Sequence, residues 1–178
     1  MKKIIIIFSK FILDRITKSY FIGLQEAGNE LPITIFPFLD FIFIYNFGNA
    51  FGLFQLEPNS YYYHAVTIFI AMINFIIFLL VFEKINGLNI LRKILNFLSI
   101  PKNWRNNPRS IIFALILGGG MGNLYDRIVY RAVIDFIDLH VADFHWPAFN
   151  IADSFITAGI IGLILAELLN REKVAKNV

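Results

Sequence analysis

Two aspartates near the end of a very apolar chain are the residues best suited to chemistry. Asp135 lies in the run V-I-D-F, and Asp153 lies in the run N-I-A-D. Ionised groups are costly in apolar surroundings unless they are paired, hydrated or functional. Two carboxylates in one poorly solvated site tend to share a proton, because both cannot ionise easily. Such a pair could serve as general base toward water and general acid toward a carbonyl group.

A simpler interpretation of the same aspartates stays open at this level. Asn150 and Asp153 are three residues apart, so they share one face of a helix. Asp153 could merely cap the start of that helix, because Asp is favoured there, while Asp135 could be a solvated loop residue. Spacing alone does not decide between a cap and a catalytic pair.

Other polar residues interrupt apolar stretches. Asp14 and Lys18 are four residues apart and can pair along one helix face. That pair is either structural or holds a substrate near the outer membrane surface. Asn46 and Gly48, in Y-N-F-G-N, predict a turn, with a substrate-contacting loop as the alternative.

Two familiar kinds of site are not supported by their motifs. The run G-G-G-M-G lacks the Gly-Lys-Ser/Thr of a phosphate loop, so close packing of helices through small residues is the better interpretation. His140, Asp143 and His145 are metal ligands by residue type, but no His-Glu-x-x-His helix accompanies them. We therefore predict no metal. The chain has no cysteine, which excludes disulfides and thiol chemistry.

The composition indicates an integral membrane protein in a single domain, residues 1–178. Hydrophobic residues make up 57% of the chain and charged residues 16%. Stretches that could cross a bilayer lie at about 4–23, 62–82, 109–127 and 151–169. The first begins like a secretory signal, but its charges and the lack of a small-residue cleavage site predict an uncleaved helix.

Lysine and arginine placement predicts the orientation of these spans. Residues 24–61 contain neither residue type, whereas 83–109 and both ends of the chain are basic. Both termini should therefore face the cytoplasm, and 24–61 and 128–150 should face outward. The basic flanks, with a sequence pI of about 9.2, suit anionic lipid headgroups rather than nucleic acid.

The outward segments differ in pattern. Residues 31–58 are rich in Ile, Phe and Tyr with Pro and Gly between them, which favours short strands. We expect a small extracytoplasmic β-sheet at the membrane interface, where aromatic rings are favoured. The segment 133–150 is shorter, and we expect a second outward loop there.

Taken together, the motifs resemble those of the bacterial lipoprotein signal peptidases, or signal peptidase II. The resemblance rests on blocks in the family's order, namely D-R-I-T-K at 14–18, N-F-G-N-A-F at 46–51, G-G-G-M-G-N-L-Y-D-R at 118–127, V-I-D-F at 133–136 and N-I-A-D at 150–153. It covers nearly the whole chain.

The resemblance implies an aspartic peptidase of the bacterial inner membrane with four transmembrane helices and a periplasmic sheet. It implies a substrate prolipoprotein cut before its diacylglyceryl-modified cysteine, with membrane lipid around it and no cofactor, and we expect a monomer. The catalytic pair falls on Asp135 and Asp153. Substrate-binding or supporting roles fall on Asp14, Lys18, Asn46, Gly48, Asn123, Asp126, Arg127, Asn150 and Ala152.

The chain departs from the family pattern at positions that do not touch the proposed pair. Arg15 stands where the family usually has Gln, Phe47 where Thr is common, and Arg131 where Gly is frequent. These departures bear on loop shape and substrate handling.

Two other classes of protein compete with a peptidase. A small membrane transporter also uses buried carboxylates, but it needs a polar path across the membrane. The spans 62–82 and 151–169 are too apolar for such a path. A non-catalytic membrane scaffold would leave the aspartate pair unexplained.

Overall fold

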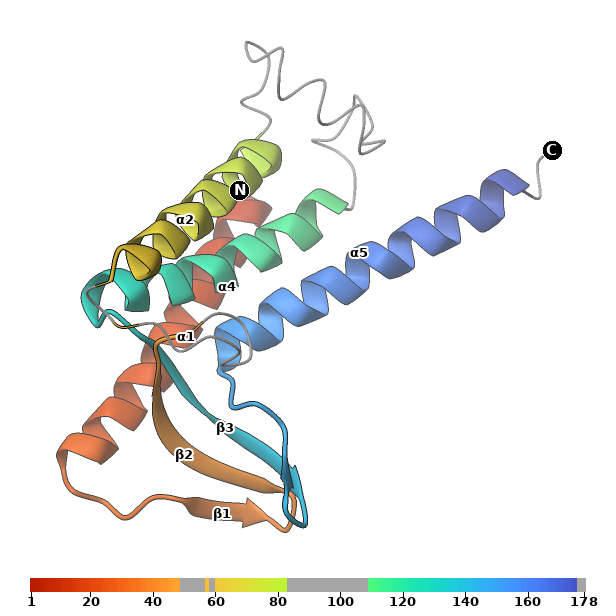
Figure 1. The fold of residues 1–178 in the computed structure, drawn as a ribbon. Helices are drawn as coiled ribbons and strands as arrows, with labels where there is room; N and C mark the ends of the chain where they lie inside the picture. The colour runs from red at the N-terminus through yellow and green to blue at the C-terminus, as the bar shows by residue number, and fades with distance from the viewer. Residues whose placement is uncertain (49–56, 58–59, 83–108, 176–178) are drawn as a thin grey trace.

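The computed structural model describes residues 1–48, 57, 60–82 and 109–175, and the remaining residues are not described further. Within these ranges the element order is α1, β1, β2, α2, α4, β3, β4 and α5. The helices α2, α4 and α5 and the first part of α1 lie at one end of the molecule, and the sheet lies at the other end, beside the last part of α1 (Figure 1).

The helices coincide with the expected spans. They run over Lys2–Glu26 (α1), Tyr61–Phe82 (α2), Arg109–Val129 (α4) and Ile151–Ala175 (α5). By length and composition, α2 and the Ile151–Leu169 part of α5 are able to cross a membrane. The basic segment 83–109, used above to orient the spans, lies outside the described residues except for Arg109.

The helical region exposes a largely apolar surface and buries several charged and polar side chains beside a small apolar core, unlike a soluble bundle. Exposed side chains on α1, α2 and α5 include Phe8, Ile16, Ile68, Phe75, Ile161 and Leu165. Asp14 and Lys18, by contrast, are fully buried within the protein. The charges that made the first span unusual therefore face the protein interior.

Helix α4 packs against each of the other three helices, and its glycines make that possible. A Cβ on Gly119 would lie 2.5 Å from the carbonyl oxygen of Ala152. A Cβ on Gly118 would lie 2.8 Å from the Cβ of Lys10. The prediction that G-G-G-M-G serves helix packing is confirmed, because side chains there would separate α4 from α1 and α5.

The sheet has the antiparallel order β1-β2-β3-β4, over Ile33–Phe36, Leu39–Asn46, Val133–Val141 and Phe144–His145. Strands expected within 31–58 are confirmed. The expectation of a second outward loop was wrong, because this segment forms β3 and β4. The run V-I-D-F-I-D-L-H-V is rich in strand-favouring residues, and pairing with β2 makes it an inner strand.

A tight connection joins α4 to β3. Helix α4 ends at Val129 and β3 begins at Val133. Arg131, between them, has a φ of 55°, in the left-handed region that favours glycine. This conformation explains why the resemblance led us to expect glycine at position 131. The short link places Asp135 close to the end of α4.

Candidate functional site

Asp135 and Asp153 line the same cavity, which has a volume of about 430 Å³. Asp135 comes from the start of β3, and Asp153 comes from the first turn of α5. Most other lining side chains are apolar, including Ile70, Ile73, Ile77, Ile116, Val133, Phe149, Ile156 and Ile160. The fold therefore brings the two predicted carboxylates to one largely apolar cavity.

Asp135 is held by neutral amides. Its Oδ2 accepts a hydrogen bond from Asn46 Nδ2 at 2.8 Å, and its Oδ1 accepts one from Asn150 Nδ2 at 2.7 Å. The side chain is almost completely buried. Burial, followed by the charge of Asp153, raises the pKa of Asp135 from 3.8 to about 7, against the opposing effect of the amides and of Lys18.

Asp153 both caps α5 and faces the cavity. The Asp153 backbone N–H donates to Asn150 Oδ1 at 2.9 Å, and the Asn150 N–H donates to Asp153 Oδ2 at 3.3 Å. This reciprocal pattern is a capping box. The other oxygen, Oδ1, accepts a bond from Asn123 Nδ2 at 2.7 Å. The capping interpretation is therefore correct, but it does not exclude a second role at the cavity.

Asn150 connects the two carboxylates. Its amide nitrogen donates to Asp135 Oδ1, as described above. The same nitrogen lies 3.1 Å from Asn123 Oδ1 and 3.2 Å from the carbonyl oxygen of Ile134. The residue is fully buried. Its position at the start of α5 thus ties the helix to β3 and α4 at one point.

A buried ion network lies beside the carboxylate pair. Lys18 Nζ is 3.1 Å from Asp14 Oδ1 and 2.6 Å from Asp126 Oδ2. Arg15 contacts the same two aspartates, at 2.8 Å and 2.6 Å. Lys18 Nζ also donates to Asn123 Oδ1 at 2.8 Å, which links the network to the amide bound to Asp153.

The same network holds the start of α5. The backbone N–H of Ala152 donates to Asp14 Oδ1 at 3.2 Å. Ala152 is completely buried, close to Gly119 of α4. The predicted pairing of Asp14 with Lys18 is confirmed, and Asp14 also fixes the first turn of the helix that carries Asp153.

Arg127 holds the end of β2. Its guanidinium donates to the carbonyl oxygen of Gly48, while the Gly48 N–H donates to Asn46 Oδ1 at 2.9 Å. The Arg127 carbonyl accepts a bond from the Tyr63 hydroxyl at 3.0 Å. The predicted turn at 46–48 is present, and it orients the amide that contacts Asp135.

Two buried residues on α2 were not identified from the sequence. Tyr63 is 1% exposed, and the Arg127 guanidinium lies over its ring, with 5.6 Å between the Arg127 Cζ and the ring centroid. Asn74 lines the cavity and donates to the Ile70 carbonyl at 2.9 Å. Asn74 is the one amide within an otherwise apolar run, which was the available signal for it.

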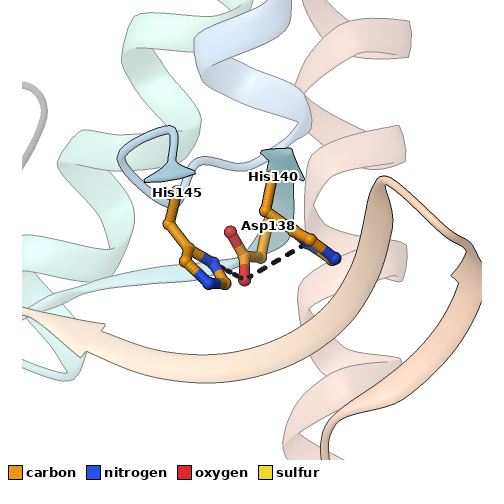
Figure 2. A group of neighbouring side chains, drawn as sticks. All are labelled: Asp138, His140 and His145. Atoms are coloured by element: carbon orange, nitrogen blue, oxygen red, sulfur yellow. Dashed lines mark hydrogen bonds and ion pairs between the residues drawn. The ribbon is translucent and has the colours of Figure 1, made fainter. Parts of the chain in front are cut away.

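The histidines of the β3–β4 hairpin do come together, but their acidic neighbour is Asp138 rather than Asp143 (Figure 2). The group lies outside the cavity lining. It is considered separately below.

Comparisons with solved structures define the class of protein. The fold matches a bacterial membrane enzyme solved by the in meso method at 2.3 Å resolution, with a TM-score of 0.64 and 25% identity over 96% of this chain and 90% of the other. A second bacterial membrane enzyme, solved by the same method at 1.9 Å resolution, gives a TM-score of 0.61 and 27% identity, covering 93% and 92%. The protein thus has the fold of a bacterial membrane enzyme.

Sequence comparisons identify the family. Residues 6–169 match the family described as "Signal peptidase (SPase) II". A lipoprotein signal peptidase of Pelagibacter ubique is 44% identical, covering 96% of this chain and 89% of the relative. One from Anaplasma phagocytophilum is 36% identical, covering 96% and 94%. The chain belongs to the signal peptidase II family of aspartic peptidases.

Proposed function

We propose that this protein, which as a member of the signal peptidase II family removes signal peptides from prolipoproteins, acts on substrates bearing a diacylglyceryl-cysteine. We propose that it cuts just before that cysteine, with Asp135 and Asp153 as its catalytic pair. One observation carries the assignment of the pair. Both carboxylates line one cavity, and the groups that contact them directly are amides rather than cations. A pair held in this way keeps a proton near neutral pH, as acid–base catalysis requires.

The proposed reaction uses the pair as one unit. The ionised carboxylate takes a proton from water as the water oxygen attacks the scissile carbonyl carbon. The protonated carboxylate gives its proton to the carbonyl oxygen. When the tetrahedral intermediate collapses, the C–N bond breaks and the leaving nitrogen receives a proton. The two carboxylates take up and release the protons in these steps, so no cofactor is needed.

The surrounding polar residues have positioning roles in this proposal. Asn46, Asn123 and Asn150 orient the carboxylates by donating to them. Arg127 holds Gly48, and Asp14, Lys18, Asp126 and Ala152 fix the junction of α1, α4 and α5. Both carboxylates come from a single chain, which supports a monomeric enzyme.

The cavity suits a lipid-bearing substrate. Six isoleucines from α2, α4 and α5 line it, next to the aspartates. Acyl chains gain about 0.8 kcal/mol for each methylene that leaves water, so they can hold a cysteine at this depth. Placing the scissile bond beside the carboxylates lowers the entropic part of the barrier.

We further propose that residues 1–178 form one domain with four transmembrane helices in the bacterial inner membrane. The start of α1 and the far end of α5 lie away from the sheet, which supports cytoplasmic termini and an extracytoplasmic sheet (Figure 1). The buried charges of α1 and its exposed apolar face support insertion of that helix too.

This topology can be tested because the chain has no cysteine. An impermeant maleimide should label Asp143→Cys, in the exposed turn before β4, in intact spheroplasts. Lys2→Cys should be labelled only after the membrane is opened. Labelling of Lys2→Cys in intact spheroplasts would contradict the topology.

The substrate is tested by comparing two forms of one precursor. The purified protein should cut a diacylglyceryl-modified prolipoprotein and leave the unmodified precursor almost uncut, at matched detergent concentration with both precursors in micelles. Mass spectrometry should place the new N-terminus at the lipidated cysteine. Equal cleavage of both forms would leave only a general membrane aspartic peptidase, and a different cut site would also refute the assignment.

A further inference from the structure

The β3–β4 hairpin gathers three possible metal ligands on one face. Asp138 and His140 are two residues apart on β3, and side chains with this spacing share a face of a strand. His145 on β4 pairs directly with His140 in the antiparallel register. The sequence spacing looked irregular because the hairpin, rather than a helix, brings these residues together.

The donor atoms converge on one carboxylate oxygen. Asp138 Oδ2 lies 2.8 Å from His145 Nδ1 and 4.0 Å from His140 Nδ1 (Figure 2). One donor atom from each of the three residues lies within 4.8 Å of the others. Donors around a tetrahedral zinc ion with bonds of about 2.1 Å stand roughly 3.4 Å apart. Small side-chain rotations would therefore close the group around an ion.

Buried polar atoms without a hydrogen-bond partner, in the hairpin and on the neighbouring strand β2, favour the binding of a cation. His140 Nδ1 is buried and has no hydrogen-bond partner among the described residues, since 4.0 Å is too long for a hydrogen bond. Asp40 on β2 stands directly opposite Asp138, and its Oδ1 is also buried without a described partner. Two facing carboxylates and an unsatisfied imidazole nitrogen would all be stabilised by a bound cation.

We propose that Asp138, His140 and His145 bind a divalent transition metal of the zinc class, which fastens β4 to β3. Two imidazole nitrogens with one carboxylate oxygen suit zinc better than calcium or magnesium, which prefer oxygen ligands alone. The exposed side of His145 leaves a fourth position to water. Asp135 lies three residues from Asp138 and so on the opposite face of β3, which separates this site from the proposed catalytic pair.

The test is zinc binding to the tag-free, full-length protein in detergent. Calorimetric titration with zinc chloride at pH 7.5 should give one site per chain, and zinc should raise the thermal unfolding midpoint. His140→Gln with His145→Gln should abolish both effects. Asp138→Asn should weaken binding at least about tenfold, since even the loss of a ligand's hydrogen-bonding partner costs about 10–100-fold.

Matched controls are available in the same chain. His64 is the remaining histidine of the three, on α2, and Asp143 is the neighbouring exposed aspartate. His64→Gln and Asp143→Asn should bind zinc as the parent does. The site is refuted if the double histidine variant binds zinc as tightly as the parent, or if Asp143→Asn weakens binding while Asp138→Asn does not.

Two checks keep the result interpretable. Every variant should retain prolipoprotein cleavage, because the site lies away from the cavity, and chelation should also leave cleavage intact. If the double variant does not fold, His145→Gln alone decides, because that side chain is 55% exposed and its loss leaves the core unchanged. Unchanged zinc affinity in a folded His145→Gln protein overturns the proposal.

Discussion

The protein contains two pairs of aspartates that lie close to each other but differ in their partners. Asp14 and Asp126 are each contacted by both Lys18 and Arg15. Asp135 and Asp153 are contacted by asparagine amides. Asn123 joins the pairs, since it accepts from Lys18 and donates to Asp153.

The difference shows how one apolar environment can hold carboxylates for opposite purposes. Two cations beside two carboxylates balance the charge of this buried cluster, and their ion pairs tie α1 to α4. Amide donors orient a carboxylate without supplying charge, so burial and the charge of Asp153 raise the pKa of Asp135. The first arrangement suits structure, and the second suits proton transfer.

The largest expected effect follows from removing either amide-held carboxylate. Asp135→Asn and Asp153→Asn should each lower prolipoprotein cleavage by about 10⁴-fold or more, because neither half of a proton-transfer pair works alone. The double variant should be scarcely slower than either single variant. Initial rates in detergent measure this, and near-parental cleavage by either folded variant would rule out the pair.

The ion-paired aspartates should behave in the opposite way. Asp14→Ala leaves Lys18 and Arg15 with one carboxylate fewer in a buried site and removes a cap from α5. We expect a loss of about 3–5 kcal/mol in the free energy of unfolding. Substrate binding should weaken more than turnover. Full stability and affinity with a loss of turnover alone would place Asp14 in the chemistry.

Asp135→Asn is the matched comparison for stability. The pKa of Asp135 is about 7 in the folded protein, above its unfolded value of about 3.9. The folded state therefore holds a proton that the unfolded state has lost, and stability falls as pH rises between these values. Asn cannot titrate, so the variant should be at least as stable as the parent above pH 7. Unfolding midpoints at pH 5 and pH 8 measure this.

Helix packing should respond to smaller changes. Gly119→Ala adds a methyl group against the Ala152 carbonyl, and we expect about 1–3 kcal/mol of destabilisation from this overpacking. Gly23→Ala on α1 is the control, because a Cβ there meets nothing within 4 Å. It should be neutral or stabilising by up to about 1 kcal/mol. Equal effects at both positions would contradict the close approach of α4 and α5.

Local patterns in the sequence predicted the helices, but they did not predict the contacts between helices. The lengths of the apolar runs predicted the helix ends to within three residues, except that α5 continues beyond 169 to Ala175. The i, i+4 spacing predicted the pair of Asp14 and Lys18, because both lie on one helix. The link from Lys18 to Asn123 depends on how α1 packs against α4, and no local pattern encodes it.

The hairpin was mispredicted for a similar reason. Residues 133–150 were expected to form a second outward loop. Pairing of β3 with β2 joins segments that are distant in sequence, and that pairing makes β3 an inner strand. Asp143 was grouped with the histidines by residue type alone, whereas the strand register places Asp138 on their face.

The smallest expected effect concerns Asn46, one of the two amides that donate to Asp135. Asn46 donates to Asp135 Oδ2 and favours its ionised form, so Asn46→Ala should raise the pKa of Asp135 further. The pair needs one proton to act, and loss of that proton should form the alkaline limb of the kcat/KM profile near pH 7. Removing the donor should move this limb upward by about 1 unit, since a hydrogen bond to a charged group contributes roughly 1.5–3 kcal/mol and water replaces part of it. Asn74→Ala, in the same cavity but without a hydrogen bond to either aspartate, should leave the limb in place. A limb that stays fixed in Asn46→Ala, or moves equally in both variants, would show that Asn46 does not act through Asp135.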